Sequence, residues 1–269
     1  MRFTLALALI PALIAVPAQA ATGDLLVAPT RIVLDGARGT EVILNNIGAD
    51  PATYRISLEL RRMTPAGMLE DVALTAANDV ESKSVAMISY APRRITLLPN
   101  QPQAIRIGIR APQGLADGEY RAHMLFRAIP AAKAATAETE GQQGLSIALT
   151  PIYGVTIPVI VRQGNLSATA NLSGAEIITD EAGTALSMSL ARVGTRSTYG
   201  TIRVYKSGVS RPVFEAKGVA VYPEITERKV KLEIPPELAT AIRGPVTIQY
   251  VDDGDASSKV IAELKTVLR

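Results

Sequence analysis

The sequence predicts an all-β protein built from two β-sandwich domains. Short segments in which apolar and polar residues alternate recur along the chain. A strand produces this period of two because its side chains point to opposite faces in turn. Turn residues such as Asp35-Gly36 and Asp117-Gly118 separate the segments at a spacing typical of sandwiches with Greek-key connections. No convincing amphipathic helix is predicted, although Pro236–Ile242 allows a short one.

Residues 1–20 are predicted to be a cleavable secretory signal. Arg2 supplies a positive charge, an apolar run follows, and Ala18-Gln19-Ala20 has the small residues of a cleavage site. The run is too short for a membrane span, which needs about 18 apolar residues, and no later stretch approaches that length. We therefore expect an exported protein without a membrane-inserted segment.

Composition excludes several classes of function. The chain has no cysteine, so it has no disulfide, no thiol nucleophile and no cysteine-based metal site. Its 28 Lys and Arg and 25 Asp and Glu residues are interspersed and give a net charge of +3, which offers a nucleic-acid partner little support. Hydrophobic residues make up 48% of the chain and aromatic ones 4%, which predicts cores that are ample and mostly aliphatic.

The N-terminal domain is expected over residues 21–163 and the C-terminal domain over residues 164–269, with the hinge at Arg162-Gln163-Gly164. Residues 131–144 are small, polar and without periodicity, which predicts a flexible loop. The strands expected before this loop are Leu25–Val27, Ile32–Leu34, Val42–Leu44, Tyr54–Leu60, Met87–Tyr90, Ile95–Leu98, Ile105–Ile109 and Tyr120–Phe126. The strands expected after the hinge are Ala185–Leu190, Thr201–Tyr205, Val213–Phe214, Val219–Val221, Val230–Ile234, Val246–Val251 and Val260–Leu268.

The stretch Leu145–Arg162 is a long strand candidate that contains two prolines. Its odd-numbered positions are almost all apolar and would form one hydrophobic face. Pro151 and Pro158 each lack the N–H that a central strand needs, so one interpretation is an edge strand with one side open. Because the two prolines have opposite parity, this interpretation includes a bulge or break near Gly154. The alternative is a buried strand pair with a loop at Thr150–Gly154, and the stretch by itself favours neither.

Catalytic and metal-binding patterns are absent from the sequence. The single histidine, His123, shares the parity of Arg121 and Leu125, which predicts a half-exposed strand position and not a catalytic base. No G-x-S-x-G, H-E-x-x-H, P-loop or G-x-G-x-x-G pattern occurs. Asp252-Asp253-Gly254-Asp255 resembles the start of a calcium loop but lacks the later ligands, so a turn is expected. The chain is therefore predicted not to be an enzyme and to hold no metal.

Five segments of the sequence, taken in order, resemble the periplasmic chaperones of bacterial pilus assembly by the chaperone–usher route. They are Val27–Gly36, Glu41–Pro51, Ser89–Ile107, Gly118–Pro130 and the strand that ends at Arg162. Each segment alone is a weak signal. Their order, combined with the secretory signal and the two sandwiches, carries the resemblance.

This resemblance implies two immunoglobulin-like domains set at an angle and no catalytic activity. Members of the family bind pilus subunits whose own sandwich lacks a strand, and they lend the last strand of their first domain. In such strand addition, main-chain hydrogen bonds supply affinity and alternate side chains fill pockets. The resemblance thus predicts a periplasmic chaperone that stabilises pilus or fimbrial subunits, delivers them to an outer-membrane usher, and uses neither a cofactor nor ATP.

The resemblance also assigns subunit-binding residues. Arg31 corresponds to the cleft arginine that grips the subunit's C-terminal carboxylate, to which a guanidinium can donate two parallel bonds. The family's second anchor is a lysine, and Pro158 stands in its place. The expected side chains of the lent strand are Leu145, Ile147 and Leu149 or, counted back from the hinge, Ile152, Val155 and Ile157. For each of these six residues, packing in the protein's own core is the alternative.

By the same resemblance, Glu119, Arg162 and an aspartate link the two domains through ion pairs. Asp252 and Asp253 both fit the aspartate position, and we take Asp253. Exposed ion pairs stabilise by only about 0–1 kcal/mol each, so the expected role is to fix the interdomain angle. The alternative is that these are unrelated surface charges.

The competing interpretation of the whole chain is an extracellular pilus subunit or adhesin made of tandem sandwiches. Such a subunit carries an N-terminal donor extension, and Ala21–Gly23 leaves almost none after the predicted signal. The sequence does not identify the client subunits, the usher or the type of appendage. It also leaves open whether the free protein self-associates through an open strand edge.

Overall fold

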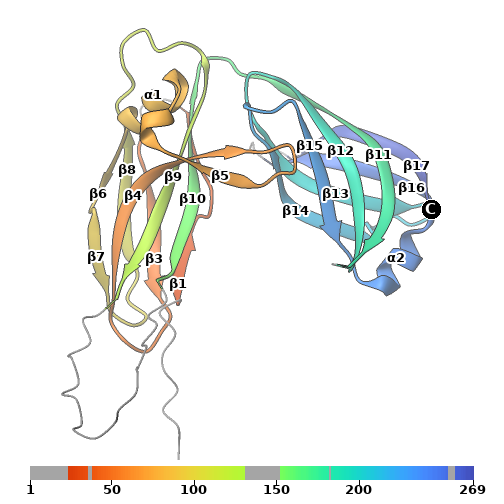
Figure 1. The fold of residues 1–269 in the computed structure, drawn as a ribbon, viewed down its shortest axis with the longest axis horizontal. Coiled ribbons are helices and arrows are strands. Elements are labelled where there is room, and N and C mark those ends of the chain that lie inside the picture. Colours follow the sequence, from red (N-terminus) through yellow and green to blue (C-terminus); the bar gives the residue numbers. More distant parts are fainter. Residues whose placement is uncertain (1–23, 36–37, 131–151, 182, 254–257) are drawn as a thin grey trace, which may run out of the picture.

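A computed structural model describes residues 24–35, 38–130, 152–181, 183–253 and 258–269. Their strands form four sheets, and Figure 1 shows two sandwiches set at an angle, which confirms the predicted fold class. The predicted signal and loop and the residues Leu145, Ile147 and Leu149 lie outside the described residues. Within the described ranges, no helix is long and apolar enough to cross a membrane.

The first sandwich packs a four-stranded sheet against a six-stranded one. The smaller sheet has the order β1 (Leu25–Ala28), β3 (Thr40–Asn46), β8 (Gln103–Ile109) and β6 (Ile88–Ala91). The larger sheet has the order β2 (Ile32–Asp35), β10 (Gly154–Gln163), β9 (Gly118–Ile129), β4 (Ala52–Met63) and β5 (Leu69–Val72), and β7 (Arg94–Leu97) also pairs with β4. Since β1 and β2 belong to opposite sheets, the chain crosses between the sheets at residues 29–31.

The second sandwich consists of a three-stranded and a four-stranded sheet. The three-stranded sheet has the order β11 (Ala168–Asp180), β12 (Gly183–Gly194) and β15 (Glu227–Glu233). The other has the order β14 (Phe214–Val221), β13 (Thr198–Lys206), β16 (Gly244–Asp252) and β17 (Lys259–Leu268). The short helix α2 (Pro236–Ile242) occupies the segment that the sequence allowed to be helical. The prediction missed β11, and it divided β14 into two strands.

Each sandwich has its own core of mainly aliphatic side chains. In β3, for example, Val42 and Leu44 are fully buried while the residues next to them are more exposed, as the period of two requires. A third apolar cluster lies where the domains meet. It contains Met63 and Ile160 from the first domain and Ala220 and Tyr222 from the second. The two domains therefore share a buried apolar contact.

Helix α1 (Asp79–Met87), which follows the 3₁₀ turn η1 (Leu74–Ala76), corrects the prediction that the first domain has no helix. Asn78 begins it with a capping box: its side chain accepts from the Glu81 N–H at 2.9 Å, and its own N–H donates to the Glu81 carboxylate at 2.8 Å. Only Ser84 and Met87 of the helix are buried, so its sequence lacks the apolar stripe that would predict an amphipathic helix. The N-x-x-E spacing was the one sequence signal available.

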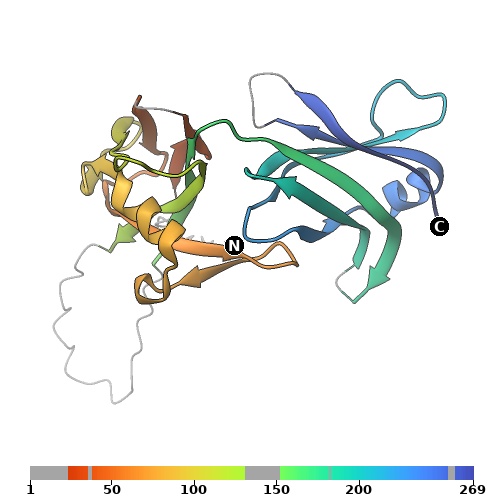
Figure 2. The same ribbon diagram turned by 90° about the horizontal axis from the view of Figure 1, so that it is seen from above.

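The hairpin of β4 and β5 reaches from the first sandwich to the second (Figures 1 and 2). At its tip, the Pro65 carbonyl accepts a hydrogen bond of 2.7 Å from the Lys229 N–H. Where β4 ends next to this turn, the Met63 N–H donates to Glu224 Oε1 at 2.7 Å. A Cβ at Gly67 would lie 2.1 Å from Arg228 Nε, and the φ of Gly67 is +82°, so glycine permits this close approach. The hairpin thus fastens the two domains together at a distance from the hinge.

Candidate functional site

Strand β10 has two halves with different neighbours. Val159–Arg162 lies between β9, to which it is antiparallel, and β2, to which it is parallel. Gly154–Pro158 pairs with β9 on one side, and no strand of the described residues pairs with its other side. The edge-strand prediction is therefore wrong for Val159–Arg162, which is central in the sheet. In the described part of the chain, the open edge is limited to Gly154–Pro158.

The direction of the backbone groups explains why Pro158 is tolerated. Ala128 donates its N–H to the Tyr153 carbonyl at 2.9 Å, so the odd-numbered residues of β10 turn their N–H and C=O groups toward β9. Pro158 is even-numbered, and the N–H that it lacks would point away from β9. The register with β9 runs without a shift from Gly154 to Gln163, so the predicted bulge is absent from this range. On the open side, the backbone of Gly154 and Thr156 is left to offer N–H and C=O groups.

The side chains of β10 divide between the core and the surface. Ile157 is 1% exposed in the core of the first sandwich, so its side chain cannot fill a partner's pocket, and its assignment to subunit binding is corrected. Val155 is partly buried against the same core. Ile152 and Tyr153, just before the strand, are 50% and 49% exposed. Of the three predicted contacts that the structure describes, Ile152 thus has the most accessible side chain.

Arg31 lies in the cleft between the domains, where the chain crosses from β1 to β2. Because Ile32 is paired with Val159, Arg31 stands beside Pro158 at the point where β2 stops covering β10. Its guanidinium carbon is 4.4 Å from the centre of the Tyr199 ring. Its Nη1 donates to the Tyr222 hydroxyl at 3.3 Å, and its Nη2 donates to Ser197 Oγ at 3.4 Å. These second-domain partners were not predicted from the sequence, because no local pattern marks residues that meet only through the interdomain angle.

A buried ion pair lies at the hinge. Arg162 Nε is 3.2 Å from Glu119 Oε2, and the two side chains are 11% and 0% exposed. The same carboxylate oxygen accepts from the Ser197 N–H at 3.1 Å and from the Ser197 hydroxyl at 2.9 Å. The structure thus brings Glu119 and Arg162 together with a residue of the second domain. It gives Asp253 other partners, the hydroxyls of Thr201 and Ser258, and this corrects its assignment to the hinge.

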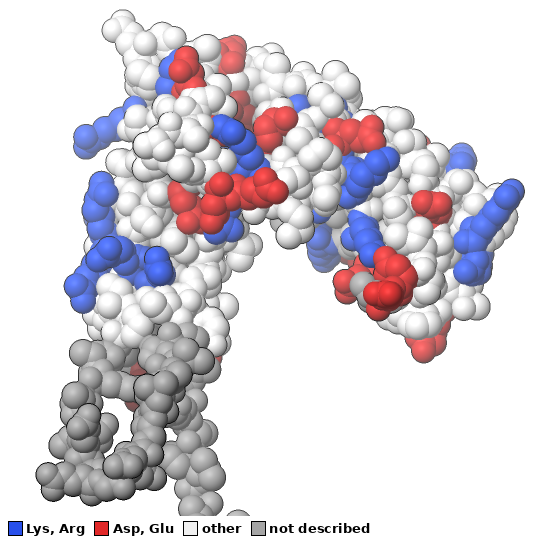
Figure 3. Space-filling model, in the orientation of Figure 1, with Lys and Arg blue, Asp and Glu red and all other residues white. Residues whose placement is uncertain are grey.

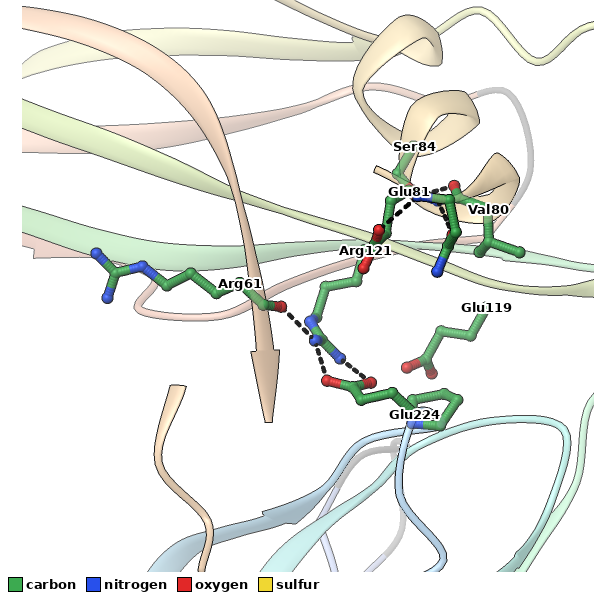
Figure 4. Close-up of a pocket in the computed structure, with 9 residues that line it drawn as sticks. Arg61, Val80, Glu81, Ser84, Glu119, Arg121 and Glu224 are labelled. Atoms are coloured by element: carbon green, nitrogen blue, oxygen red, sulfur yellow. Dashed lines mark hydrogen bonds and ion pairs between the residues drawn. The ribbon is translucent and has the colours of Figure 1, made fainter. Parts of the chain in front are cut away.

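A cavity of about 220 Å³ lies between α1, the start of β9 and the turn after β14 (Figure 4). Arg121 crosses it and pairs with Glu224 at 2.6 Å, while the same guanidinium group donates to the Arg61 carbonyl at 2.9 Å. The Arg121 guanidinium also lies 3.6 Å from the centre of the Tyr222 ring. These contacts join the two domains across the cavity wall. Among the described residues, no group of three or more metal-ligating side chains occurs.

His123 is buried, which corrects the prediction of a half-exposed histidine. Its side chain points to the sheet face that carries Arg121, as the parity predicted, but it is 1% exposed because neighbouring side chains cover it. Burial, together with the smaller effect of the positive charges of Arg121, Arg61 and Arg31, lowers the pKa of His123 to about 3. The imidazole is therefore neutral, and neither ring nitrogen has a hydrogen-bond partner in the described part of the chain.

No protein-family model and no curated protein sequence matches the chain. Solved structures with a similar fold include the chaperone CsuC in complex with the tip subunit CsuE from archaic chaperone–usher pili of Acinetobacter baumannii. That match has 10% identity and a TM-score of 0.49, and it covers 91% of this chain and 99% of that one. The E. coli chaperone DraB matches at 13% identity and a TM-score of 0.47, over 91% and 96% of the two chains.

The chaperone SafB, solved with the SafA pilin of Salmonella enterica, matches at 14% identity and a TM-score of 0.45, over 91% of this chain and 97% of that one. Each of these three solved structures contains a chaperone, the class of protein that the sequence resembles. Identities of 10–14% and TM-scores below 0.5 assign no function to this chain. What the chain does must come from its own residues.

Proposed function

We propose that this chain is a periplasmic chaperone that binds pilus or fimbrial subunits by lending them the edge of β10, and that it delivers them to an outer-membrane usher. The observation that carries the proposal is the half-open strand: Gly154–Pro158 has one side without a partner strand in the described part of the chain. Such an edge is a template onto which another chain can add a strand.

The position of β2 favours one direction for the added strand. Since β2 occupies this side of β10 from Val159 onward and runs parallel to it, a client strand in the same line must end beside Arg31. A parallel client strand would place its C-terminal carboxylate there, whereas an antiparallel one would place its ammonium group there. An arginine favours the carboxylate, because charge-assisted bonds to an anion are stronger than neutral ones. The geometry therefore supports a parallel client strand held at its C-terminus.

The uncharged character of the open edge also supports the proposal. None of the five residues Gly154–Pro158 carries a charge, although charged side chains are a common way to prevent strands from pairing at an exposed edge. An incomplete subunit exposes its own unpaired strand edge and apolar groove. Pairing the two edges would satisfy the backbone groups of both chains and cover the groove.

Co-expression with candidate pilus subunits in the periplasm tests the proposal. We expect the wild-type chain to recover soluble subunit in a pull-down, and an Ile147→Asp variant to recover much less, because a charge on the lent strand cannot enter an apolar pocket. A Val209→Asp variant, which adds the same single charge at an exposed apolar position of the second domain, is the matched control. Equal recovery by the wild type and Ile147→Asp would count against strand lending.

A further inference from the structure

We propose that Tyr199 of the second domain, with Ser197 and Tyr222, positions Arg31 for a carboxylate, so that both domains build the anion site. This inference rests on the proposed function for its client. The observation behind it is that every described side-chain contact of the Arg31 guanidinium reaches the second domain. The hinge and the hairpin keep that domain in place.

Tyr199 supplies a surface for the guanidinium. At 4.4 Å from the ring centre, the Arg31 guanidinium carbon lies within the range of a cation–π contact, and the second ring, Tyr222, lies at 5.9 Å. An arginine on a flexible stem loses conformational freedom when it binds an anion. A guanidinium that already rests on a ring has lost part of that freedom in advance, so less is lost when a carboxylate arrives.

The hydrogen bonds of Arg31 are of a kind that a carboxylate can replace. Both terminal nitrogens donate to neutral hydroxyls at 3.3 and 3.4 Å, which is long for such bonds, and the buried Nε has no partner among the described residues. Bonds from a guanidinium to a carboxylate are shorter and stronger. The tyrosine and serine hydroxyls therefore hold Arg31 in the cleft without competing strongly against an anionic ligand.

Ser197 connects this site to the hinge. Its hydroxyl accepts from Arg31 and donates to Glu119 Oε2, the oxygen that pairs with Arg162. Each group donates to the next: the Arg31 guanidinium to the Ser197 hydroxyl, and this hydroxyl to the Glu119 carboxylate. Ser197 is fully buried, so this connection is shielded from solvent. Arg31 is thus held relative to the hinge ion pair, which keeps it beside the end of the open edge.

The test is the preference for a free carboxylate, measured by isothermal titration calorimetry on the whole mature chain. The probes are the peptide acetyl-Lys-(Thr-Val)₄ with a free C-terminus and its C-terminal amide. Wild type should bind the acid roughly tenfold more tightly, as expected for a charge-assisted pair. Tyr199→Leu keeps apolar bulk but removes the ring, and should reduce this acid-to-amide ratio about threefold or more. Tyr199→Phe, which keeps the ring, should restore it.

A role of Tyr199 in packing alone would weaken both peptides equally and leave the ratio unchanged, and that result would overturn the inference. Absence of any acid preference in the wild type, including failure to bind either peptide, would overturn it as well. If Tyr199→Leu does not fold, Tyr222→Phe is the deciding variant, because it removes only the hydroxyl that accepts from Arg31, and it should lower the acid-to-amide ratio. Failure of the proposed function is recognised separately: wild type would then recover no subunit in the co-expression assay, whatever the peptide ratio is.

Discussion

Two strand edges of this molecule differ in how they are protected from pairing with another strand. The edge of β15 in the second domain carries exposed charged residues at alternate positions, namely Glu227, Lys229, Lys231 and Glu233. The tip of the β4–β5 hairpin also covers it, since the Lys229 N–H, which points away from β12, donates to the Pro65 carbonyl. The edge of β10 at Gly154–Pro158 has neither charges nor, in the described part of the chain, a cover.

The difference indicates that the β15 edge is protected from pairing with another chain, whereas the β10 edge is available for it. Charged side chains and covering segments are the usual means by which a protein prevents edge-to-edge association. The molecule applies both to β15 and neither to the first half of β10, although the two edges belong to the same chain. Figure 3 shows charged residues of both signs on the visible face of both domains. The absence of charge at Gly154–Pro158 is therefore not a property of the whole surface.

The largest effect is expected from proline substitutions that differ by one position in β10. Thr156→Pro removes an N–H from the open side, so the fold should survive with a loss of about 1 kcal/mol from the bond between Thr156 and Glu59, while client capture falls strongly. Val155→Pro removes an N–H that points to β9 and should destabilise the domain by about 3 kcal/mol or more. Urea unfolding, combined with the subunit pull-down, separates the two outcomes.

This pair of variants tests whether the N–H groups of odd-numbered residues in β10 point to β9 and those of even-numbered residues point to the open side. Val155→Pro and Thr156→Pro introduce the same ring one residue apart, so a difference between them cannot come from the ring itself. If both variants unfold to the same extent, the assignment of the even-numbered groups to the open side is wrong. If Thr156→Pro folds and captures subunits normally, the open edge is not the binding edge.

A smaller effect is expected from removing Glu224, which helps to hold the β4–β5 hairpin that covers the β15 edge. Glu224 accepts from the Met63 N–H and pairs with Arg121, whose side chain is 8% exposed. Glu224→Ala leaves that arginine buried without its carboxylate, which should lower the free energy of unfolding by about 2 kcal/mol. Small-angle scattering should also show a broader range of interdomain angles. Glu263→Ala, which removes an exposed carboxylate from β17, is the matched control, and an equal loss in both variants would contradict this account of the hairpin.

The fold class could be predicted from the sequence because a strand has a local sequence pattern. The predicted strands correspond to described ones since apolar alternation and turn residues act within a few positions. The features that were missed depend on contacts distant in sequence or on weak local patterns. Helix α1 buries only two side chains, and β5 exists because β4 pairs with it as a hairpin. Neither has an apolar face of its own that a period could reveal.

The candidate site was predictable only in part, for a similar reason. Counting back from the hinge selected Ile152, Val155 and Ile157, but it could not show that Ile157 points into the protein's own core, where it is 1% exposed. Parity placed His123 on the correct face, yet it could not show that this position is buried, because burial depends on residues distant in sequence. Tyr199 and Ser197 become partners of Arg31 only through the interdomain angle, and no spacing in the sequence encodes that angle.

His123 tests the same region, because it lies on β9 opposite Pro158, on the paired side of the strand whose other side is the open edge. Its pKa is about 3 in the folded protein and about 6.5 in the unfolded chain, so the unfolded chain binds more protons between these values. Folding stability should therefore fall as the pH drops from about 6.5 toward 3. His123→Leu should flatten this part of the stability profile and, at pH 7, add about 1 kcal/mol, because neither ring nitrogen has a partner. Urea unfolding from pH 7 to pH 4 measures both, and an unchanged slope would show that His123 is not buried as a neutral group.

The smallest effect concerns the contact by which the hairpin tip covers β15. Gly67 and Gly114 both have positive φ, at +82° and +72°, so alanine at either position meets the same backbone strain of about 1 kcal/mol. At Gly114 a Cβ would meet nothing within 4 Å, whereas at Gly67 it would lie 2.1 Å from Arg228 Nε. Gly67→Ala should therefore be less stable than Gly114→Ala by about a further 1 kcal/mol.

Displacing the tip should also uncover the Lys229 N–H, which in the native protein donates to Pro65. The charged residues of β15 would then be the only protection left at that edge. If they suffice, Gly67→Ala stays monomeric in analytical ultracentrifugation and differs from Gly114→Ala in stability alone. If concentration-dependent association appears in Gly67→Ala and not in Gly114→Ala, the hairpin itself helps to keep the β15 edge unpaired. Equal behaviour of the two variants in both the stability and the association measurements would mean that the tip is not docked on β15.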